Sequence, residues 1–327
     1  MDLNFNLDIP ASNRLDAGAV SGHRFDLIIL GGGPAGMTAA VYASRKQLDT
    51  LLVSPDLGGQ VLVTSGVENY IGFQYVTGPE LSQKFSAHIR QFPLKILSAE
   101  KGTGVAQLPD GSFQVRTDAG SELVARTLIL ATGKRWRKLG VPGEDDYLGR
   151  GVSTCSVCDA PFFQGQPVVV AGGGNSALTA ALDLLNVKSR VTVVNFADGW
   201  QADPVLLDRV RGRATLLDAH RILEIMGDGQ RVTGLRVAPR HGGAERRLET
   251  QGVFIEIGLI PNTELFREFI QLNALGEIVV DGANRTSRPG VYAAGDCTTV
   301  PEKQIIIAAG EGAKAALTAY THLSLIR

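Results

Sequence analysis

The sequence has few residues that could build a metal centre or a disulfide framework, with three cysteines and five histidines in 327 residues. No second cysteine pair accompanies Cys155 and Cys158, and the histidines are scattered (His23, His88, His220, His241 and His322). A structural zinc site would therefore have to be assembled from remote segments. So few cysteines also fit a reducing compartment, where a disulfide is more often catalytic than structural.

Excess charge and long apolar runs are lacking as well. The formal net charge is -1, which gives no electrostatic reason to expect binding to nucleic acid or to an anionic membrane. No apolar run approaches the roughly 18 residues of a membrane span. Residues 1–23 contain neither a basic start followed by an apolar run nor an Arg-rich amphipathic pattern. We therefore expect a cytoplasmic protein with a flexible N-terminal arm over residues 1–24.

A glycine-rich fingerprint follows the first apolar segment. Residues 25–30 predict a strand, residues 31–36 read GGGPAG, and residues 37–45 predict a helix. In this spacing Gly31 makes the tight turn, Gly33 lets the backbone approach a pyrophosphate, and Gly36 lets helix and strand pack closely. The helix N-terminus then offers free N–H groups to the phosphates. The pattern predicts dinucleotide binding, and Asp56, after a second strand over residues 50–54, is a candidate for the ribose.

A second fingerprint repeats this order. Residues 167–171 predict a strand, residues 172–177 read GGGNSA, and a helix is expected to continue to Leu185. The next strand, over residues 190–196, should carry the residue that selects the cofactor, because an acidic residue favours NAD and arginines favour NADP. Asn195, Phe196 and Ala197 provide neither. NADPH use is therefore doubtful, and this fold is expected to act mainly as a scaffold for the cysteines.

The two fingerprints and their strands predict the α/β class, with two Rossmann-like, three-layer nucleotide-binding domains. The composition becomes basic after Gly133, and residues 259–263 are interpreted as a second crossing between the domains. Residues 77–91 predict a helix opened by a capping box, and residues 96–117 a small antiparallel insert. The segment that ends at Asp296 is expected to return to the first domain and to precede a final helix over residues 304–323.

The sequence Cys155-Ser156-Val157-Cys158-Asp159 places two thiols two residues apart at an expected helix start. A disulfide there can open and close without movement of the backbone. We interpret it as a redox centre because it lies between the two fingerprints. A zinc half-site and two inert buried cysteines are the alternatives.

Together these motifs resemble the low-molecular-weight thioredoxin reductases, which are FAD disulfide oxidoreductases, from Arg24 to Leu323. The resemblance rests on GGGPAG, GGQ with VENYIG, TGPEL, ATG, GRGVSTCSVCD, the second fingerprint, IGLIPNT and GVYAAGD. It implies a homodimer and a discontinuous FAD domain, residues 25–133 and 259–327, with residues 134–258 inserted as the NAD(P)H-type domain that carries the cysteines. The FAD contacts that it implies are Gly31, Gly33, Pro34, Ala35, Gly36, Gln60, Asn69, Thr132, Gly133, Gly295, Asp296, Gln304 and Ile305.

The same resemblance implies a route for electrons. They would pass from reduced FAD to the disulfide through Cys158, after which Cys155 attacks the disulfide of a thioredoxin. Asp159 would act as a general acid–base whose pKa is raised by burial, and a capping carboxylate is the alternative. Because residues 195–197 depart from the His-Arg-Arg type of segment, the chain resembles the NADPH-independent branch, which includes the ferredoxin-dependent flavin thioredoxin reductases and the deeply rooted thioredoxin reductases. Ferredoxin is then a candidate donor.

The final helix carries small residues on one face (Ala308, Ala309, Gly310, Gly312 and Ala313). They fit close packing under a flat ligand or an ordinary packed helix. Tyr320 or His322 is expected to stack on the flavin. Two further functions stay open, a small-molecule dithiol oxidase that uses FAD and oxygen, and a non-enzymatic flavoprotein redox sensor.

Overall fold

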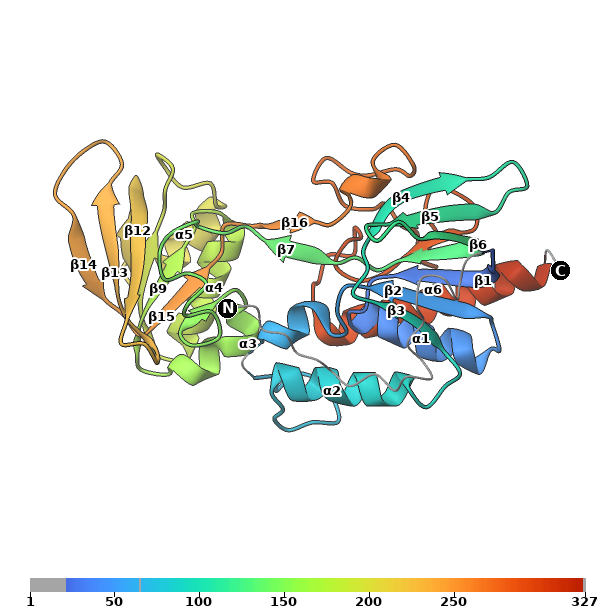
Figure 1. Ribbon diagram of the computed structural model, residues 1–327. Coiled ribbons are helices and arrows are strands. Elements are labelled where there is room, and N and C mark those ends of the chain that lie inside the picture. Colours follow the sequence, from blue (N-terminus) through green and yellow to red (C-terminus); the bar gives the residue numbers. More distant parts are fainter. Residues whose placement is uncertain (1–21, 65, 326–327) are drawn as a thin grey trace.

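The computed structural model describes residues 22–64 and 66–325, and two lobes are joined by a pair of strands (Figure 1). The joining strands are β7 (Lys134–Trp136) and β16 (Leu259–Pro261), which pair antiparallel. Residues 1–21 of the expected arm lie outside the described residues, and β1 begins at Arg24. The chain therefore crosses between the lobes twice, side by side.

The first lobe is built on a seven-stranded sheet in the order β3-β2-β1-β6-β5-β4, with β17 paired to β6. Its strands are β1 (Arg24–Leu30), β2 (Thr50–Ser54), β3 (Lys95–Ser98), β4 (Gly102–Gln107), β5 (Phe113–Thr117), β6 (Glu122–Leu130) and β17 (Val291–Ala293). Strand β3 pairs parallel with β2, and only β4 and β5 pair antiparallel with their neighbours. The antiparallel insert expected over residues 96–117 is therefore wrong at its start, because residues 95–98 form β3, which pairs parallel with β2 at the edge of the sheet.

Three helices accompany this sheet, α1 (Pro34–Arg45), α2 (Gly78–Ile89) and α6 (Ile305–Leu325), and α1 and α6 lie along the same face of it (Figure 1). The capping box at the start of α2 is confirmed, because Thr77 and Glu80 each accept a hydrogen bond from the other's backbone N–H. Helices α1 and α6 approach closely at Gly312, where a Cβ would lie 2.0 Å from the carbonyl oxygen of Ala35. Short 3-10 helices span η2 (Gly59–Val63) and η4 (Glu264–Phe266).

The second lobe contains a parallel five-stranded sheet in the order β11-β10-β9-β15-β8. Its strands are β8 (Val152–Ser153), β9 (Pro167–Ala171), β10 (Arg190–Val194), β11 (Thr215–Leu217) and β15 (Gly252–Ile255), with helices α3 (Ser156–Asp159), η3 (Ala160–Phe163), α4 (Asn175–Asn186) and α5 (Pro204–Val210). A separate antiparallel sheet joins β12 (His220–Gly227), β13 (Val232–Pro239) and β14 (Arg246–Glu249).

The parallel strands β3-β2-β1-β6-β17 of the first sheet and the parallel second sheet confirm the predicted α/β class with Rossmann-like cores. Strand β17 lies beside β6 although the whole second lobe separates them in the sequence, so the first lobe is discontinuous. None of the helices in residues 22–64 and 66–325 is both long and apolar enough to cross a membrane. The same residues contain no cluster of three His, Cys, Asp or Glu side chains that could hold a metal ion.

Candidate active site

Cys155 and Cys158 form a disulfide at the point where the second lobe faces the first. Strand β8 ends at Ser153, and Cys155 is the N-cap residue of α3, so both sulfurs belong to one turn and their Cα atoms lie 5.3 Å apart. Both cysteines are half-buried. The third cysteine, Cys297, is fully buried in the core of the first lobe and is not part of this pair.

One backbone N–H of this turn points at the Cys155 sulfur. The N–H of Cys158 donates to Cys155 Sγ over 3.2 Å, and the N–H of Cys155 itself donates to Ser153 Oγ over 3.1 Å. An N–H that points at sulfur stabilises a thiolate more than a thiol. The turn therefore favours negative charge on Cys155 once the disulfide is opened.

Asp159 lies directly behind the second cysteine and is buried. Burial raises the pKa of its carboxyl above the usual range, and a hydrogen bond from Ser153 opposes part of that rise. One carboxyl oxygen, Oδ1, makes no hydrogen bond. Since a carboxyl with a raised pKa holds its proton to higher pH, Asp159 can supply or receive a proton beside the dithiol.

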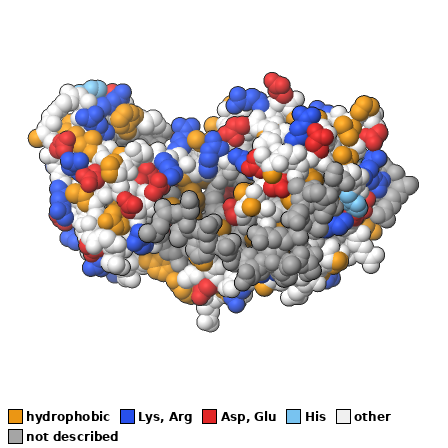
Figure 2. Space-filling model, viewed as in Figure 1, with side chains coloured by type: hydrophobic (Ala, Val, Ile, Leu, Met, Phe, Trp, Pro, Cys, Tyr) orange, Lys and Arg blue, Asp and Glu red, His pale blue; other side chains and the backbone are white. Residues whose placement is uncertain are grey.

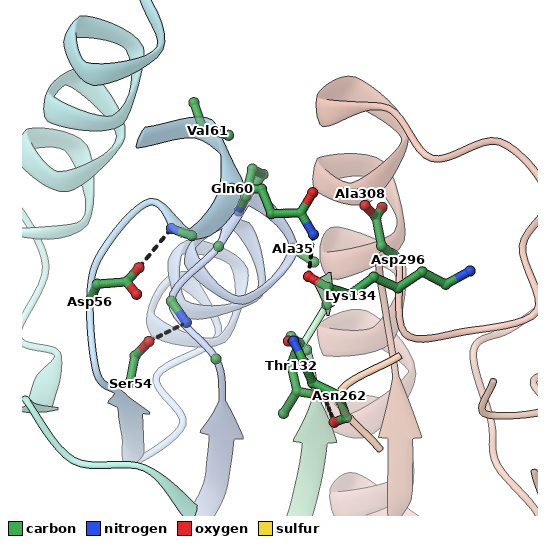
Figure 3. Close-up of a pocket in the computed structure, with 18 of the residues that line it drawn as sticks. Ala35, Ser54, Asp56, Gln60, Val61, Thr132, Lys134, Asn262, Asp296 and Ala308 are labelled. Atoms are coloured by element: carbon green, nitrogen blue, oxygen red, sulfur yellow. Dashed lines mark hydrogen bonds between the residues drawn. The ribbon is translucent and has the colours of Figure 1, made fainter. Parts of the chain in front are cut away.

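The disulfide shares a cavity of about 850 Å³ with the first fingerprint. Figure 3 shows part of the lining, including Ala35, Gln60 and Asp296. The backbone crowding explains two of its glycines, because a Cβ at Gly31 would lie 2.2 Å from the carbonyl oxygen of Ala131 and one at Gly36 only 1.8 Å from that of Gly31. At Gly33 a Cβ would meet nothing within 4 Å. Gly33 is also the N-cap of α1, which has no side-chain cap and no acidic residue in its first turn. The backbone there is open to a ligand.

Eleven of the thirteen FAD contacts implied by the resemblance line this cavity, namely Gly31, Gly33, Pro34, Ala35, Gln60, Thr132, Gly133, Gly295, Asp296, Gln304 and Ile305. The other two do not. Gly36 packs against the Gly31 backbone, and Asn69 donates from Nδ2 to Oε1 of Gln304 over 3.1 Å, so it contacts a lining residue instead. Asp56 lines the cavity, but its Oδ1 accepts a hydrogen bond from the N–H of Gly59 (Figure 3).

The sequence interpretation missed three lining residues, Lys134 in β7, Asn262 directly after β16 and Lys303 just before α6. Asn262 accepts at its backbone oxygen a hydrogen bond from Thr132 Oγ1 (2.7 Å) and donates from Nδ2 to the Thr132 carbonyl (2.9 Å), as Figure 3 shows. Lys134 forms an ion pair with Glu277 over 2.6 Å, and Lys303 lies 3.6 Å from the same carboxylate. Both lysines line the cavity and oppose the rise that burial causes in the pKa of Asp296. The IPNT motif was the available signal for Asn262.

Tyr320 and His322 are not at this cavity, so the expectation that either stacks on flavin is wrong. The cavity is lined by the first turn of α6, at Ile305 and Ala308, whereas at about 1.5 Å per residue the helix carries Tyr320 some 20 Å further along. Tyr320 packs beneath Lys46, whose Nζ lies 4.8 Å from the ring centroid, and His322 contacts the ring of Tyr292.

A second cavity of about 1060 Å³ lies over the second fingerprint. A Cβ at Gly172 would lie 2.3 Å from the carbonyl oxygen of Glu256, while one at Gly174 would meet nothing within 4 Å. As at α1, the helix that follows, α4, has no side-chain cap. Arg137, Lys138 and Arg221 are among the lining residues. Figure 2 shows the hollow between the lobes, with Lys and Arg side chains along its border.

The residues after β10 are committed to internal contacts. Asn195 is buried and donates from Nδ2 to the carbonyl oxygens of Ala197 and Gly199 and to Asp218. Phe196 is 58% exposed, and the Arg240 guanidinium lies 4.7 Å from its ring centroid. Asp198 pairs with Arg240 and His241. Asn195 therefore fixes the conformation of this loop. The basic side chains Arg240 and His241 already pair with the Asp198 carboxylate.

Comparisons with known proteins agree with this geometry. Residues 25–313 match the family model described as pyridine nucleotide-disulphide oxidoreductase. The chain is 44% identical over 320 residues, 97% of its length and 60% of the relative's, to alkyl hydroperoxide reductase F of Xanthomonas campestris pv. phaseoli. It is 41% identical over 301 residues, 91% of its length and 59% of the relative's, to a protein named NADH dehydrogenase from Bacillus subtilis.

The chain thus spans about 60% of the length of these curated relatives. By contrast, it covers 99% of a crystal structure of thioredoxin reductase from Streptococcus pyogenes, using 92% of its own residues, with a TM-score of 0.87 and 35% identity. The enzyme class predicted from the cysteine motif and the fingerprints is confirmed. The chain belongs to the pyridine nucleotide-disulphide oxidoreductase family and is a thioredoxin reductase-like disulfide oxidoreductase.

Proposed function

We propose that the chain is an FAD-dependent enzyme that passes two electrons from a reduced pyridine dinucleotide, through Cys155 and Cys158, to the disulfide of a partner protein. The observation that carries this proposal is that the disulfide and the first fingerprint line one cavity. Because both face the same space, a group held by that fingerprint can exchange electrons with the sulfurs.

The residues present fit FAD. The open backbone at Gly33 and the uncapped N-terminus of α1 suit a pyrophosphate. Asp296 and Gln304 supply polar groups further along the same cavity. When bound, FAD supplies the exchange of electrons between a two-electron donor and the disulfide. The chain's own part is to hold it against Cys155 and Cys158.

The chemistry of the dithiol follows from its surroundings. Opening the disulfide takes two electrons and two protons and gives two thiols, or one proton and a thiol with a thiolate. Asp159, whose pKa is raised by burial, is placed to supply one proton. The N–H of Cys158 favours the thiolate on Cys155, which then attacks a disulfide of the partner, releasing one partner thiolate and forming a mixed disulfide that the second cysteine resolves.

The second cavity is the proposed site of the electron donor. Its open Gly174 and uncapped α4 repeat the features of the first fingerprint. Phe196 and Ala197 bring no positive charge to the end of β10, and Asp198 neutralises Arg240, so NADH suits this loop better than NADPH. One relative is named NADH dehydrogenase, which supports that choice. Ferredoxin, expected from the sequence, is the alternative donor.

The partner is proposed to carry a redox disulfide of the thioredoxin type. The structural relatives are thioredoxin reductases. The name alkyl hydroperoxide reductase F favours a second candidate, the disulfide form of a peroxide-reducing protein. A homodimer and a cytoplasmic location, both expected from the sequence, belong to the same proposal.

The test is anaerobic electron transfer followed by flavin absorbance and by the appearance of partner thiols. The holoenzyme is mixed in turn with NADH, NADPH and reduced ferredoxin, in the presence of oxidised thioredoxin. We expect bleaching by NADH and two thioredoxin thiols per NADH consumed. Bleaching by ferredoxin alone would replace the donor, and flavin reduction without any partner thiols, with thioredoxin or with a peroxide-reducing disulfide protein, would contradict the proposed function.

Matched cysteine variants make the result specific. Cys155→Ser and Cys158→Ser should each abolish the transfer to thioredoxin while leaving reduction of the flavin by NADH. Cys297→Ser removes the remaining, buried cysteine and should leave the transfer unchanged. Retained transfer in Cys155→Ser would exclude this residue as the attacking sulfur.

A further inference from the structure

Ser156, between the two cysteines, is held by two carboxyl groups. Its Oγ donates to Oδ2 of Asp183, on α4, over 3.0 Å. Its backbone N–H forms a hydrogen bond with Glu256. This N–H belongs to the peptide group that joins Cys155 to Ser156, and Ser156 is only 7% exposed, so water screens neither contact well.

Sheet register explains why Glu256 reaches this peptide. Strands β15 and β8 are parallel neighbours in which Phe254 lies opposite Ser153. Glu256 and Cys155 each follow two residues later, at the same edge of the sheet. The carboxyl ends of parallel strands meet at one edge, so the fold brings this glutamate beside the redox turn although a hundred residues separate them in the chain.

The charge of Glu256 changes near neutral pH. Burial and then the negative charge of Asp183 raise its pKa to about 7, against the hydrogen bond from Ser156. The charged or titratable groups around it are Asp183 from α4, and Arg137, Lys138, His220 and Arg221, which line the same second cavity. Of these, Asp183 raises the pKa of Glu256 by its negative charge.

We propose that Glu256 is a positioning residue that controls the acidity of Cys155, by holding the Cys155–Ser156 peptide and by opposing the Cys155 thiolate once it is itself ionised. The inference rests on the proposed role of the two cysteines. It adds a residue to which neither the family match nor the sequence motif assigns a role.

The charges of Glu256 and Asp183 determine in which direction the pKa of Cys155 changes. Below pH 7 Glu256 is neutral, and the thiolate is stabilised by the N–H of Cys158 without opposition. Above pH 7 a second negative charge joins Asp183 at Ser156, so the thiolate costs more free energy. Glu256 and Cys155 therefore titrate as a coupled pair. Removing only the charge of Glu256 should make Cys155 more acidic above pH 7 and change little below pH 6.

The experiment measures Cys155 alkylation directly. In a Cys158→Ser background the reduced holoenzyme is treated with iodoacetamide from pH 5 to 10, and labelling of the Cys155 peptide is followed by mass spectrometry. Glu256→Gln keeps an oxygen that accepts from the Ser156 N–H but carries no charge. We expect roughly tenfold faster labelling than in the background at pH 8 and equal rates near pH 5.5. Superimposable profiles would overturn the proposal.

Two further variants separate charge from packing. Asp183→Asn removes the neighbouring charge and should move the inflection near pH 7 to lower pH; an unmoved inflection would also count against the proposal. Glu100→Gln alters a buried glutamate of the first lobe, bound by Thr117 and Ser121, and should leave the profile unchanged; an equal effect there would show that the change is not specific to Glu256. Labelling requires no electron donor or partner, so failure of the proposed electron transfer would leave this measurement intact.

Discussion

The ring of Phe162, four residues after Cys158, meets the ring of Tyr75 edge to face, with centroids 6.1 Å apart and an angle of 85°. Phe162 also lies over Gly66, where a Cβ would come within 2.6 Å of its ring. Tyr75 and Gly66 belong to the first lobe, whereas Phe162 lies in η3 of the second. The contact therefore holds the redox turn against the cavity of the first fingerprint.

Tyr75→Ala should loosen that hold. An aromatic pair of this kind contributes about 0.5–1.5 kcal/mol beyond its buried area. We expect amide hydrogen exchange in residues 155–163 to become roughly three to ten times faster, with little change in β1 or β6. Tyr42→Ala, which removes a tyrosine of α1 that is 39% exposed, is the control. Unchanged exchange in Tyr75→Ala would mean that other contacts hold the turn.

The same glycine-to-alanine substitution in the two fingerprints should weaken the binding of two different ligands. Gly33 and Gly174 are both N-cap residues in extended conformation, and a Cβ at either meets no protein atom within 4 Å. Gly33→Ala should leave the free energy of unfolding of the FAD-free protein unchanged. It should lower the affinity for FAD at least tenfold, because the added methyl group occupies the space into which the pyrophosphate fits. Gly174→Ala should instead leave FAD binding unchanged and weaken the pyridine dinucleotide.

Titration calorimetry or flavin fluorescence measures both affinities. Gly36→Ala supplies the contrast, because its Cβ would lie 1.8 Å from the Gly31 oxygen and should lower the melting temperature even without FAD. Equal FAD affinity in Gly33→Ala and in the unaltered protein would place the pyrophosphate elsewhere.

Sequence reasoning predicts local structure well at these fingerprints. Strand, glycine turn and helix follow one another in the chain, so the spacing of Gly31, Gly33 and Gly36 contains the physical reason for the fold. The capping box of α2 is equally local, since Thr77 and Glu80 are three residues apart.

The remaining features depend on pairing between remote segments. The Thr132–Asn262 hydrogen bonds and the Lys134–Glu277 ion pair follow from the two crossings between lobes, which sequence spacing does not encode. Tyr320 differs from its expected place for another reason. Its chemistry suits flavin, but the rise of α6 carries it away from the cavity.

Asp159 predicts a pH dependence of stability. Its pKa is higher in the folded chain than its ordinary value of 3.8, so the folded state gains stability when the carboxyl is protonated. This contribution is fully present below the unfolded pKa and is lost as pH rises through the folded pKa. Asp159→Asn avoids the loss and should raise the melting temperature at pH 7.5 by about 2–4 °C, with little difference near pH 3.5.

Calorimetry at both pH values makes this measurement. Asp281→Asn is a control of opposite sign, because the backbone hydrogen bond from Arg285 lowers the pKa of Asp281. That variant should melt at lower temperature at pH 7.5. A melting temperature of Asp159→Asn below that of the unaltered protein at pH 7.5 would mean that the charged carboxylate is stabilised by a contact stronger than its burial.

The loop after β10 predicts the choice between pyridine dinucleotides. Phe196 is 58% exposed and lies just after β10 in the lining of the second cavity, in the region where an arginine accommodates the 2′-phosphate of NADPH in this kind of fold. A charge-assisted contact between guanidinium and phosphate is a strong one, so Phe196→Arg should tighten NADPH by roughly tenfold and change NADH by less than threefold. Binding is measured by titration calorimetry with the oxidised enzyme. Phe196→Leu, which removes the ring beneath Arg240 without adding charge, is the matched control.

Arg221→Ala tests the basic side chain that already lines this cavity. The preference for NADH is wrong if NADPH binds the unaltered protein as tightly as NADH and loses affinity in Arg221→Ala. In that case Arg221 provides the contact to the 2′-phosphate.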